Sequence, residues 1–279
     1  MMIEKRKFIQ GSKWLYLKIY TGVKTSDVLL EEVIQPLIEF FIENNYISKW
    51  FFIRYNDPKL HLRVRFELSD NNYYNEILTK IQFTFEKYIN SGEIANFVID
   101  TYSREIERYG ISTMDDAEYL FYKNSDFFVK ECLHLDDEEK IIISLFYVDK
   151  ILDLLKLSIN EKLLWIKNSN DAFKKEFNAD KKLNSQLDKK YRLFKPKYVD
   201  FIESEEYLDF RENNEAHIIE LAPTLENIIL KSPSLQDLFQ SIFHMNINRM
   251  FVSNQRLFEM IIYDYLFRYY KTISFHEFK

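Results

Sequence analysis

KWFFIRYNDPKLHLRVRF, residues 49–66, predicts two β-strands that form a hairpin. The turn falls at Asn56, Asp57 and Pro58, because Asx residues and proline favour turn geometry. Apolar residues occupy every second position after the turn and share one face of the second strand: Leu60, Leu62, Val64 and Phe66. The opposite face carries His61, Arg63 and Arg65. The hairpin therefore has one apolar face and one cationic face.

The cationic face suggests a site for an anion. A guanidinium group stays charged and offers paired donors to a carboxylate or phosphate, or it can pair with a structural carboxylate. A strand facing solvent would carry the same charges, so the pattern alone leaves both interpretations open.

Outward from the hairpin, the chain alternates between strand and helix patterns. In residues 13–22 the side chains alternate in the pattern of a strand, which ends at Gly22. Residues 25–45 carry an apolar stripe with helical spacing, and Pro36 should kink or break this helix. A helix is expected at about 72–90, and a strand begins at about 96. From 113 onward the patterns are helical, with proline punctuation at 223 and 233.

Early strands and late helices predict an α+β fold. We expect a mainly antiparallel sheet from the N-terminal half, packed with helices, and a helix-rich C-terminal half. We expect one domain over 1–279, with a helical insertion rich in Lys and Asn around 168–197.

Composition excludes several classes of protein. The sequence has only four Gly and no GxGxxG or GxxxxGK[ST] motif, which excludes nucleotide binding through those loops. The net charge of −6 argues against direct nucleic-acid binding. Cys132 is the single cysteine, so disulfides and thiolate zinc sites are not expected. With no signal peptide and no apolar run of about 20 residues, a cytoplasmic protein is expected.

Two further segments carry candidate site residues. TYSREIERYG, residues 101–110, contains Arg104 and Arg108, although Arg108 could simply pair with Glu105 along a helix. SIFHMNINRM, residues 241–250, contains His244 and Arg249 in an apolar context, where a histidine is more often structural than catalytic. No HExxH motif or clear carboxylate–histidine cluster is seen, so a metal site is not expected.

Several arginines and one titratable histidine would suit a β-elimination. The arginines could hold a leaving carboxylate, and His244 could move the proton without any cofactor. An anion-binding module would use the same arginines, and spacing does not decide between the two.

The segments WLYLKIY, WFFIRYNDPKLHLRVRF, YSREIERYG with AEYLF, and HMNINR occur in the order seen in lantibiotic dehydratases. The chain resembles the C-terminal, SpaB-C-type domain of those enzymes, also called the thiopeptide-type bacteriocin biosynthesis domain, over roughly 13–270. That resemblance implies elimination of glutamate from glutamylated Ser or Thr of a ribosomal precursor peptide, which leaves dehydroalanine or dehydrobutyrine.

The resemblance also implies roles for individual residues. It matches Arg63, Arg65 and Arg104 to the arginines of the family and His244 to its histidine. The expected substrate contacts around these catalytic residues are Arg54, His61, Arg108 and Arg249. The chain departs from the family pattern in having Ile111 after Gly110, where a second glycine is usual.

The implied partners are a leader–core precursor peptide, a separate glutamylating dehydratase subunit and a cyclase. Because the large glutamylating domain is absent from this sequence, we expect a free-standing elimination half. Two alternatives remain. One is a thiopeptide pyridine synthase, which joins two dehydroalanines in a formal [4+2] cycloaddition with loss of the leader. The other is a non-catalytic subunit that binds a peptide or partner.

Overall fold

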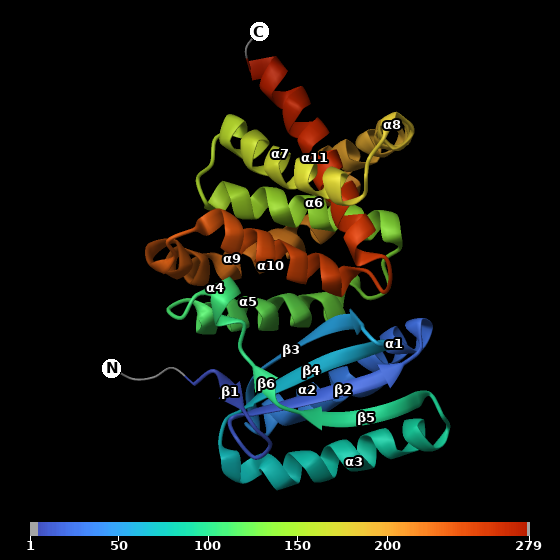
Figure 1. The fold of residues 1–279 in the computed structure, drawn as a ribbon, viewed down its shortest axis with the longest axis vertical. Coiled ribbons are helices and arrows are strands. Elements are labelled where there is room, and N and C mark those ends of the chain that lie inside the picture. The colour runs from blue at the N-terminus through green and yellow to red at the C-terminus, as the bar shows by residue number, and fades with distance from the viewer. Residues whose placement is uncertain (1–4, 278–279) are drawn as a thin grey trace. The chain divides into compact units, whose positions relative to one another are not determined.

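The computed structural model describes residues 5–277, with side chains through residue 275 (Figure 1). Contacts divide it into two compact units. The sheet unit runs through His134 and also includes Leu230–Pro233 and Asn248–Ser253. The helical unit comprises Leu135–Ile229, Ser234–Ile247 and the segment from Asn254 onward.

The sheet unit is built on a four-stranded antiparallel sheet in the order β3-β4-β2-β5 (Figure 1). Its strands are β2 (Trp14–Thr21), β3 (Ile47–Asn56), β4 (Leu60–Leu68) and β5 (Ile94–Asp100). A two-stranded antiparallel ribbon pairs β1 (Lys7–Phe8) with β6 (Tyr102–Ser103). The predicted hairpin is confirmed as β3 and β4, and the antiparallel α+β class is confirmed with it.

Pro36 follows a change of helix type within one continuous helical segment, rather than the expected break. The segment consists of α1 (Val23–Leu29), a π-helical turn (Leu30–Ile34) and α2 (Gln35–Glu43). Pro36 lies in the first turn of α2, where its missing N–H is tolerated. A π-helical turn falls immediately before α2, because a proline ring clashes with the carbonyl four residues earlier and has no N–H to donate to it.

Both faces of the central strand β4 are buried. On the apolar face, Phe66 packs against Phe41 of α2 at 5.8 Å between ring centroids. The helix α3 (Tyr74–Asn90), preceded by a 3₁₀ turn (Asn71–Tyr73), packs Phe85 against Phe97 of β5. On the cationic face, Tyr102 of β6 packs edge-on against Trp14. The predicted division into two faces is correct, but the cationic face is covered as well.

The remaining helical segments of the sheet unit are α4 (Ile106–Tyr109), α5 (Met114–Phe127) and a π-helical turn (Phe128–Cys132).

The outer edge of β3 is covered by polar side chains rather than by a strand. From α5, Ser125 accepts the backbone N–H of Phe52 at 3.2 Å. The Asn248 carboxamide accepts from the Arg54 N–H at 2.8 Å and donates to the Arg54 carbonyl at 2.9 Å. These bonds satisfy backbone groups that a neighbouring strand would otherwise pair.

Over residues 135–277, the helical unit contains six helices, of which two contribute residues to both units. They are α6 (Asp137–Leu154), α7 (Ile159–Glu176), α8 (Lys181–Glu203), α9 (Leu208–Lys231), α10 (Leu235–Met250) and α11 (Gln255–Glu277), with a 3₁₀ turn at Glu205–Tyr207. Asp136 and Ser158 form capping boxes that fix the starts of α6 and α7.

The stretch 168–197, rich in Lys and Asn, lies within α7 and α8 apart from their short connection. Its aromatic residues Phe173, Tyr191 and Phe194 are buried in the helical unit, and α11 packs along α7. The stretch is therefore helical and contributes to a core. Within the described residues, no helix is long and apolar enough to cross a membrane.

Candidate functional site

The cationic face of β4 is lined by aromatic residues from its neighbours. Strand pairing places Arg65 between Tyr16 of β2 and Phe51 of β3. It likewise places His61 between Tyr20 and Tyr55. Residues directly opposite one another in an antiparallel sheet project to the same face, so the charges predicted on this strand lie among rings.

Arg65 is buried in an aromatic cage. Its guanidinium carbon lies 4.4 Å from the ring centroid of Tyr16, 5.0 Å from that of Tyr102 and 5.1 Å from that of Phe51. The residue is 8% exposed, and its Nε and Nη1 have no hydrogen-bond partner among the described residues. Ring faces attract the cation without using its N–H donors. Arg65 therefore has two buried N–H donors that no described protein group accepts.

Arg63 and His61 form a linked pair two residues from Arg65. Arg63 stacks on Tyr55, with 3.4 Å between its guanidinium carbon and the ring centroid, and its Nε donates to His61 Nε2 at 3.1 Å. Because Nε2 accepts this bond, Nδ1 carries the imidazole proton and donates to the carbonyl of Lys59 at 2.8 Å.

His61 is held neutral. Burial lowers the pKa of its imidazole, and the nearby charges of Arg63, Lys18 and Arg65 lower it further, while the Lys59 carbonyl opposes the shift. Both ring nitrogens of His61 form hydrogen bonds, one with Arg63 and one with the Lys59 carbonyl. The geometry therefore suits His61 to orienting Arg63 rather than to transferring a proton.

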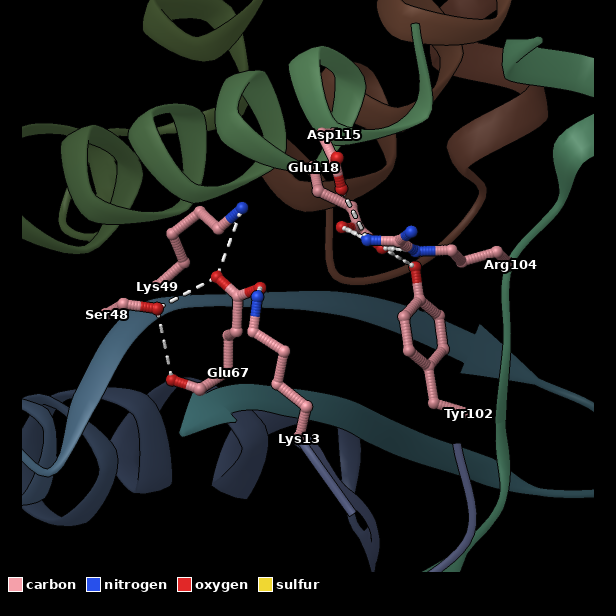
Figure 2. Close-up of polar contacts among 8 residues, drawn as sticks. All are labelled: Lys13, Ser48, Lys49, Glu67, Tyr102, Arg104, Asp115 and Glu118. Carbon is pink, nitrogen blue, oxygen red and sulfur yellow. Dashed lines mark hydrogen bonds and ion pairs between the residues drawn. The ribbon is translucent and has the colours of Figure 1, made fainter. Parts of the chain in front are cut away.

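Glu67 lies on the same face of β4 as Arg65, and neighbouring lysines balance its negative charge (Figure 2). Lys13 Nζ lies 2.7 Å from Oε1, while Lys49 Nζ and the Ser48 hydroxyl lie 3.1 and 2.8 Å from Oε2. Burial alone would raise the pKa of this carboxyl, but these donors outweigh it and lower the pKa. Glu67 is thus an ionised carboxylate with its own cations.

Arg104 binds a second buried carboxylate, as Figure 2 shows. Its Nε and Nη2 donate to Glu118 at 2.8 and 2.6 Å, and Nη2 also contacts Asp115 at 2.6 Å. The Tyr102 hydroxyl donates to Glu118 at 2.7 Å. Burial raises the pKa of Glu118 although Arg104 and Tyr102 oppose it. Arg104 thus anchors Tyr102, one wall of the Arg65 cage, through Glu118.

Arg108 lies differently from Arg104. Its side chain is 48% exposed and pairs with Glu105 at 3.3 Å, three positions away. This is the local helical pair that its spacing allowed. The catalytic role expected for Arg104 and the substrate contact expected for Arg108 stay predictions.

Arg54 and Arg249 are buried and bonded within the sheet unit. Arg54 donates to the Arg249 carbonyl and to Ser26, and its Nη2 lies 2.6 Å from Asp27. Arg249 donates from Nε to Ser125 at 2.9 Å. These contacts join β3 to α1, α5 and the end of α10. The role of either residue in substrate binding stays a prediction, and the bonds seen here are those of structural arginines.

In the helical unit, His244 belongs to a carboxylate–histidine pair that the sequence did not reveal. Its Nδ1 lies 2.8 Å from Oε2 of Glu259, which is buried and also accepts from Arg256 Nη1 at 3.1 Å. His244 itself is half-buried. A carboxylate at Nδ1 fixes the imidazole tautomer and leaves Nε2 to accept a proton. The only hint in the sequence is an acidic residue, Glu259, between Phe258 and Met260 in an apolar helix.

The sequence does not reveal the aromatic cage, because Tyr16 of β2 and Tyr102 of β6 are far apart in the chain and meet only in the folded sheet unit. The sheet unit thus places Arg65, with unpartnered donors, among aromatic rings, and the helical unit places His244 beside a buried carboxylate.

Comparison with known proteins finds one family that matches most of the chain and a curated relative that matches part of it. The family described as "Lantibiotic biosynthesis dehydratase C-term" matches residues 14–270. The subtilin biosynthesis protein SpaB of Bacillus subtilis is 28% identical over 187 residues, which are 62% of this chain and 17% of SpaB.

Solved structures share the fold. The tRNA-dependent lantibiotic dehydratase MibB from Microbispora sp. 107891 matches with a TM-score of 0.74 and 19% identity, over 96% of this chain and 29% of that one. The pyridine synthase TbtD from thiomuracin biosynthesis matches with a TM-score of 0.59 and 10% identity, over 94% of this chain and all of TbtD. The chain therefore spans about a sixth of SpaB and less than a third of the MibB chain.

Proposed function

Because the chain belongs to the lantibiotic biosynthesis dehydratase C-terminal family, we propose that it eliminates glutamate from glutamylated Ser or Thr residues. The substrate is a ribosomally made precursor peptide, and the products are dehydroalanine or dehydrobutyrine and free glutamate. A separate glutamylating enzyme supplies the substrate, and a cyclase uses the dehydrated product.

The observation that carries the proposal is the free donor set of Arg65. In the elimination a base removes the proton on Cα of the esterified residue. The Cα–H electron pair forms the Cα=Cβ double bond, and the Cβ–O bond breaks, so glutamate leaves as a carboxylate. Negative charge grows on the departing carboxylate in the transition state, where a guanidinium in a dry aromatic cage stabilises it.

His244 supplies the base. With Glu259 on Nδ1, the imidazole accepts the Cα proton on Nε2, and the buried carboxylate offsets the positive charge that this creates. Arg63, stacked on Tyr55 and fixed by His61, provides a second cation for the glutamyl group. Every group in this proposed mechanism is a side chain of this protein.

The test is mass spectrometry of a Ser-glutamylated precursor peptide incubated with the purified protein. We expect loss of the glutamyl group with formation of dehydroalanine. Arg65→Ala should slow this loss about tenfold to a hundredfold, the range expected when a charge-assisted hydrogen bond is removed. His244→Ala should abolish it with the fold intact by circular dichroism.

Two results would assign another function. If the glutamylated peptide is unchanged but a peptide with two dehydroalanines is cyclised with loss of its leader, the protein is a pyridine synthase. If both peptides bind and neither reacts, it is a binding subunit.

A further inference from the structure

Two buried carboxylates lie close to the Arg65 cage, and either could neutralise Arg65. Glu67 is two residues further along the same face of β4, so its Cα is about 7 Å from that of Arg65. Glu118 accepts from the hydroxyl of Tyr102, whose ring lies 5.0 Å from the Arg65 guanidinium. An arginine beside two buried acids would ordinarily form a salt bridge with one of them.

Neither acid pairs with Arg65, because each is occupied by other donors. Glu118 is held by Arg104 and Tyr102, and Glu67 by Lys13, Lys49 and Ser48 (Figure 2). No ion pair between Arg65 and a carboxylate within 4.0 Å is found among the described residues. The N–H donors of Arg65 thus stay unpaired because other donors already bind Glu67 and Glu118.

Lys49 is the more buried of the two lysines at Glu67, although Lys13 lies closer, at 2.7 Å against 3.1 Å. Its side chain is 18% exposed, against 59% for Lys13, so its charge is less screened by water. It also acts on Glu118, whose pKa it helps to lower against the dominant effect of burial. Lys49 therefore forms an ion pair with Glu67 and also acts electrostatically on Glu118.

We propose that Lys49, assisted by Lys13, is a positioning residue that holds Glu67 away from Arg65 and so keeps Arg65 available for a carboxylate ligand. The inference rests on the proposed function only in taking glutamate as that ligand. Without Lys49, Glu67 keeps one exposed lysine and turns toward the nearest unpaired cation on its own strand face, which is Arg65. The internal carboxylate then occupies the donors that the ligand needs.

The experiment is a calorimetric titration of free L-glutamate into the full chain and its variants. Lys49→Met removes the ammonium and keeps the aliphatic volume, and we expect it to weaken binding about tenfold. Lys49→Met combined with Glu67→Gln should restore binding to within about threefold of wild type, because the competing charge is gone. Glu67→Gln alone should bind as wild type does, and Arg65→Ala should lose binding.

Lys13→Met is the second variant, at an exposed position where a folding defect is not expected. It should weaken binding about threefold, less than Lys49→Met, because Lys49 remains. The proposal is overturned if both lysine variants bind glutamate as wild type does, if Glu67→Gln fails to rescue Lys49→Met, or if wild type binds no glutamate.

The binding pattern is separable from the proposed reaction. A protein that shows loss and rescue of glutamate binding, yet leaves a glutamylated peptide unchanged, refutes the elimination and supports the role of Lys49. A protein that eliminates glutamate while Lys49→Met binds and reacts as wild type refutes the role of Lys49 alone.

Discussion

His244 and Glu259 share a hydrogen bond of 2.8 Å between Nδ1 and Oε2, formed across α10 and α11 by residues 15 positions apart. Glu259 is buried and is also bound by Arg256 at 3.1 Å. The carboxylate therefore orients the imidazole and compensates its charge when Nε2 takes a proton. This relationship gives His244 a supporting residue that can be tested separately.

Glu259→Gln should slow elimination about tenfold to a hundredfold through kcat, with KM little changed. The amide has the shape of the carboxylate but cannot offset the charge of a protonated imidazole. Steady-state release of glutamate from the glutamylated peptide measures both constants.

Glu176→Gln is the matched control for Glu259→Gln. Glu176 also binds Arg256, at 3.1 Å from its Nε, but no contact with His244 is found among the described residues. It should leave kcat near the wild-type value. Equal kcat values in the two variants would remove Glu259 from the mechanism.

Arg104→Ala should lower the free energy of unfolding by about 3–5 kcal/mol, because it leaves the fully buried Glu118 without its cation. Arg108→Ala, which removes an exposed local pair, should change it by less than about 1 kcal/mol. Urea denaturation followed by circular dichroism measures both. Similar small changes in both variants would show that the Glu118 pair contributes little to stability and would favour a substrate role for Arg104.

The hairpin and its two faces could be predicted from the sequence because they follow from local rules. Residues 60–66 alternate strictly, and turn formers separate them from the preceding strand. An irregularity of the helix near Pro36 follows from backbone chemistry alone, although the structure has a π-helical turn there rather than a break. Strand order could not be predicted, because β2 joins β4 and β5 through pairings distant in sequence.

The charged residues of the site could be identified as candidates, but their partners could not. The alternation of apolar and charged residues predicts that Arg65 lies on the cationic face. Its burial depends on Tyr102, which belongs to the two-stranded ribbon of β1 and β6. Arg54 and Arg65 look alike in sequence, and only the tertiary contacts distinguish an arginine bonded to protein groups from one with free donors. The His244–Glu259 pair could not be predicted, because it joins side chains of two different helices, α10 and α11, 15 positions apart.

His61 should make stability depend on pH. Burial, followed by Arg63, Lys18 and Arg65, lowers the pKa of its imidazole below the ordinary value of about 6.5 despite the opposing Lys59 carbonyl. The unfolded chain therefore binds the proton more readily than the folded protein. The stabilisation is complete above pH 6.5 or so and is lost as the pH falls below that value toward the lowered pKa.

The measurement for His61 is the free energy of unfolding between about pH 7.5 and pH 5.5. His61→Gln keeps an acceptor for Arg63 and cannot be protonated, so it should lose less stability over this range than wild type. His134→Gln, at an exposed position, controls for the loss of an imidazole. If His61→Gln and wild type show the same slope, His61 is not held neutral by the fold.

Asn248→Ala should lower the free energy of unfolding by about 1–3 kcal/mol, because it leaves the N–H and carbonyl of Arg54 unpaired at the outer edge of β3. Asn213→Ala, at an exposed position of α9, is the control and should stay within about 0.5 kcal/mol of wild type. Chemical denaturation measures the free energy of unfolding of both variants. Hydrogen exchange at the backbone amide of Arg54 measures directly how well the outer edge of β3 is protected. Faster exchange of that amide in Asn248→Ala, with unchanged exchange in Asn213→Ala, is expected if the carboxamide replaces a neighbouring strand. Exchange at the wild-type rate in Asn248→Ala would mean that the edge is protected by other groups, and the loss of stability would then need another cause.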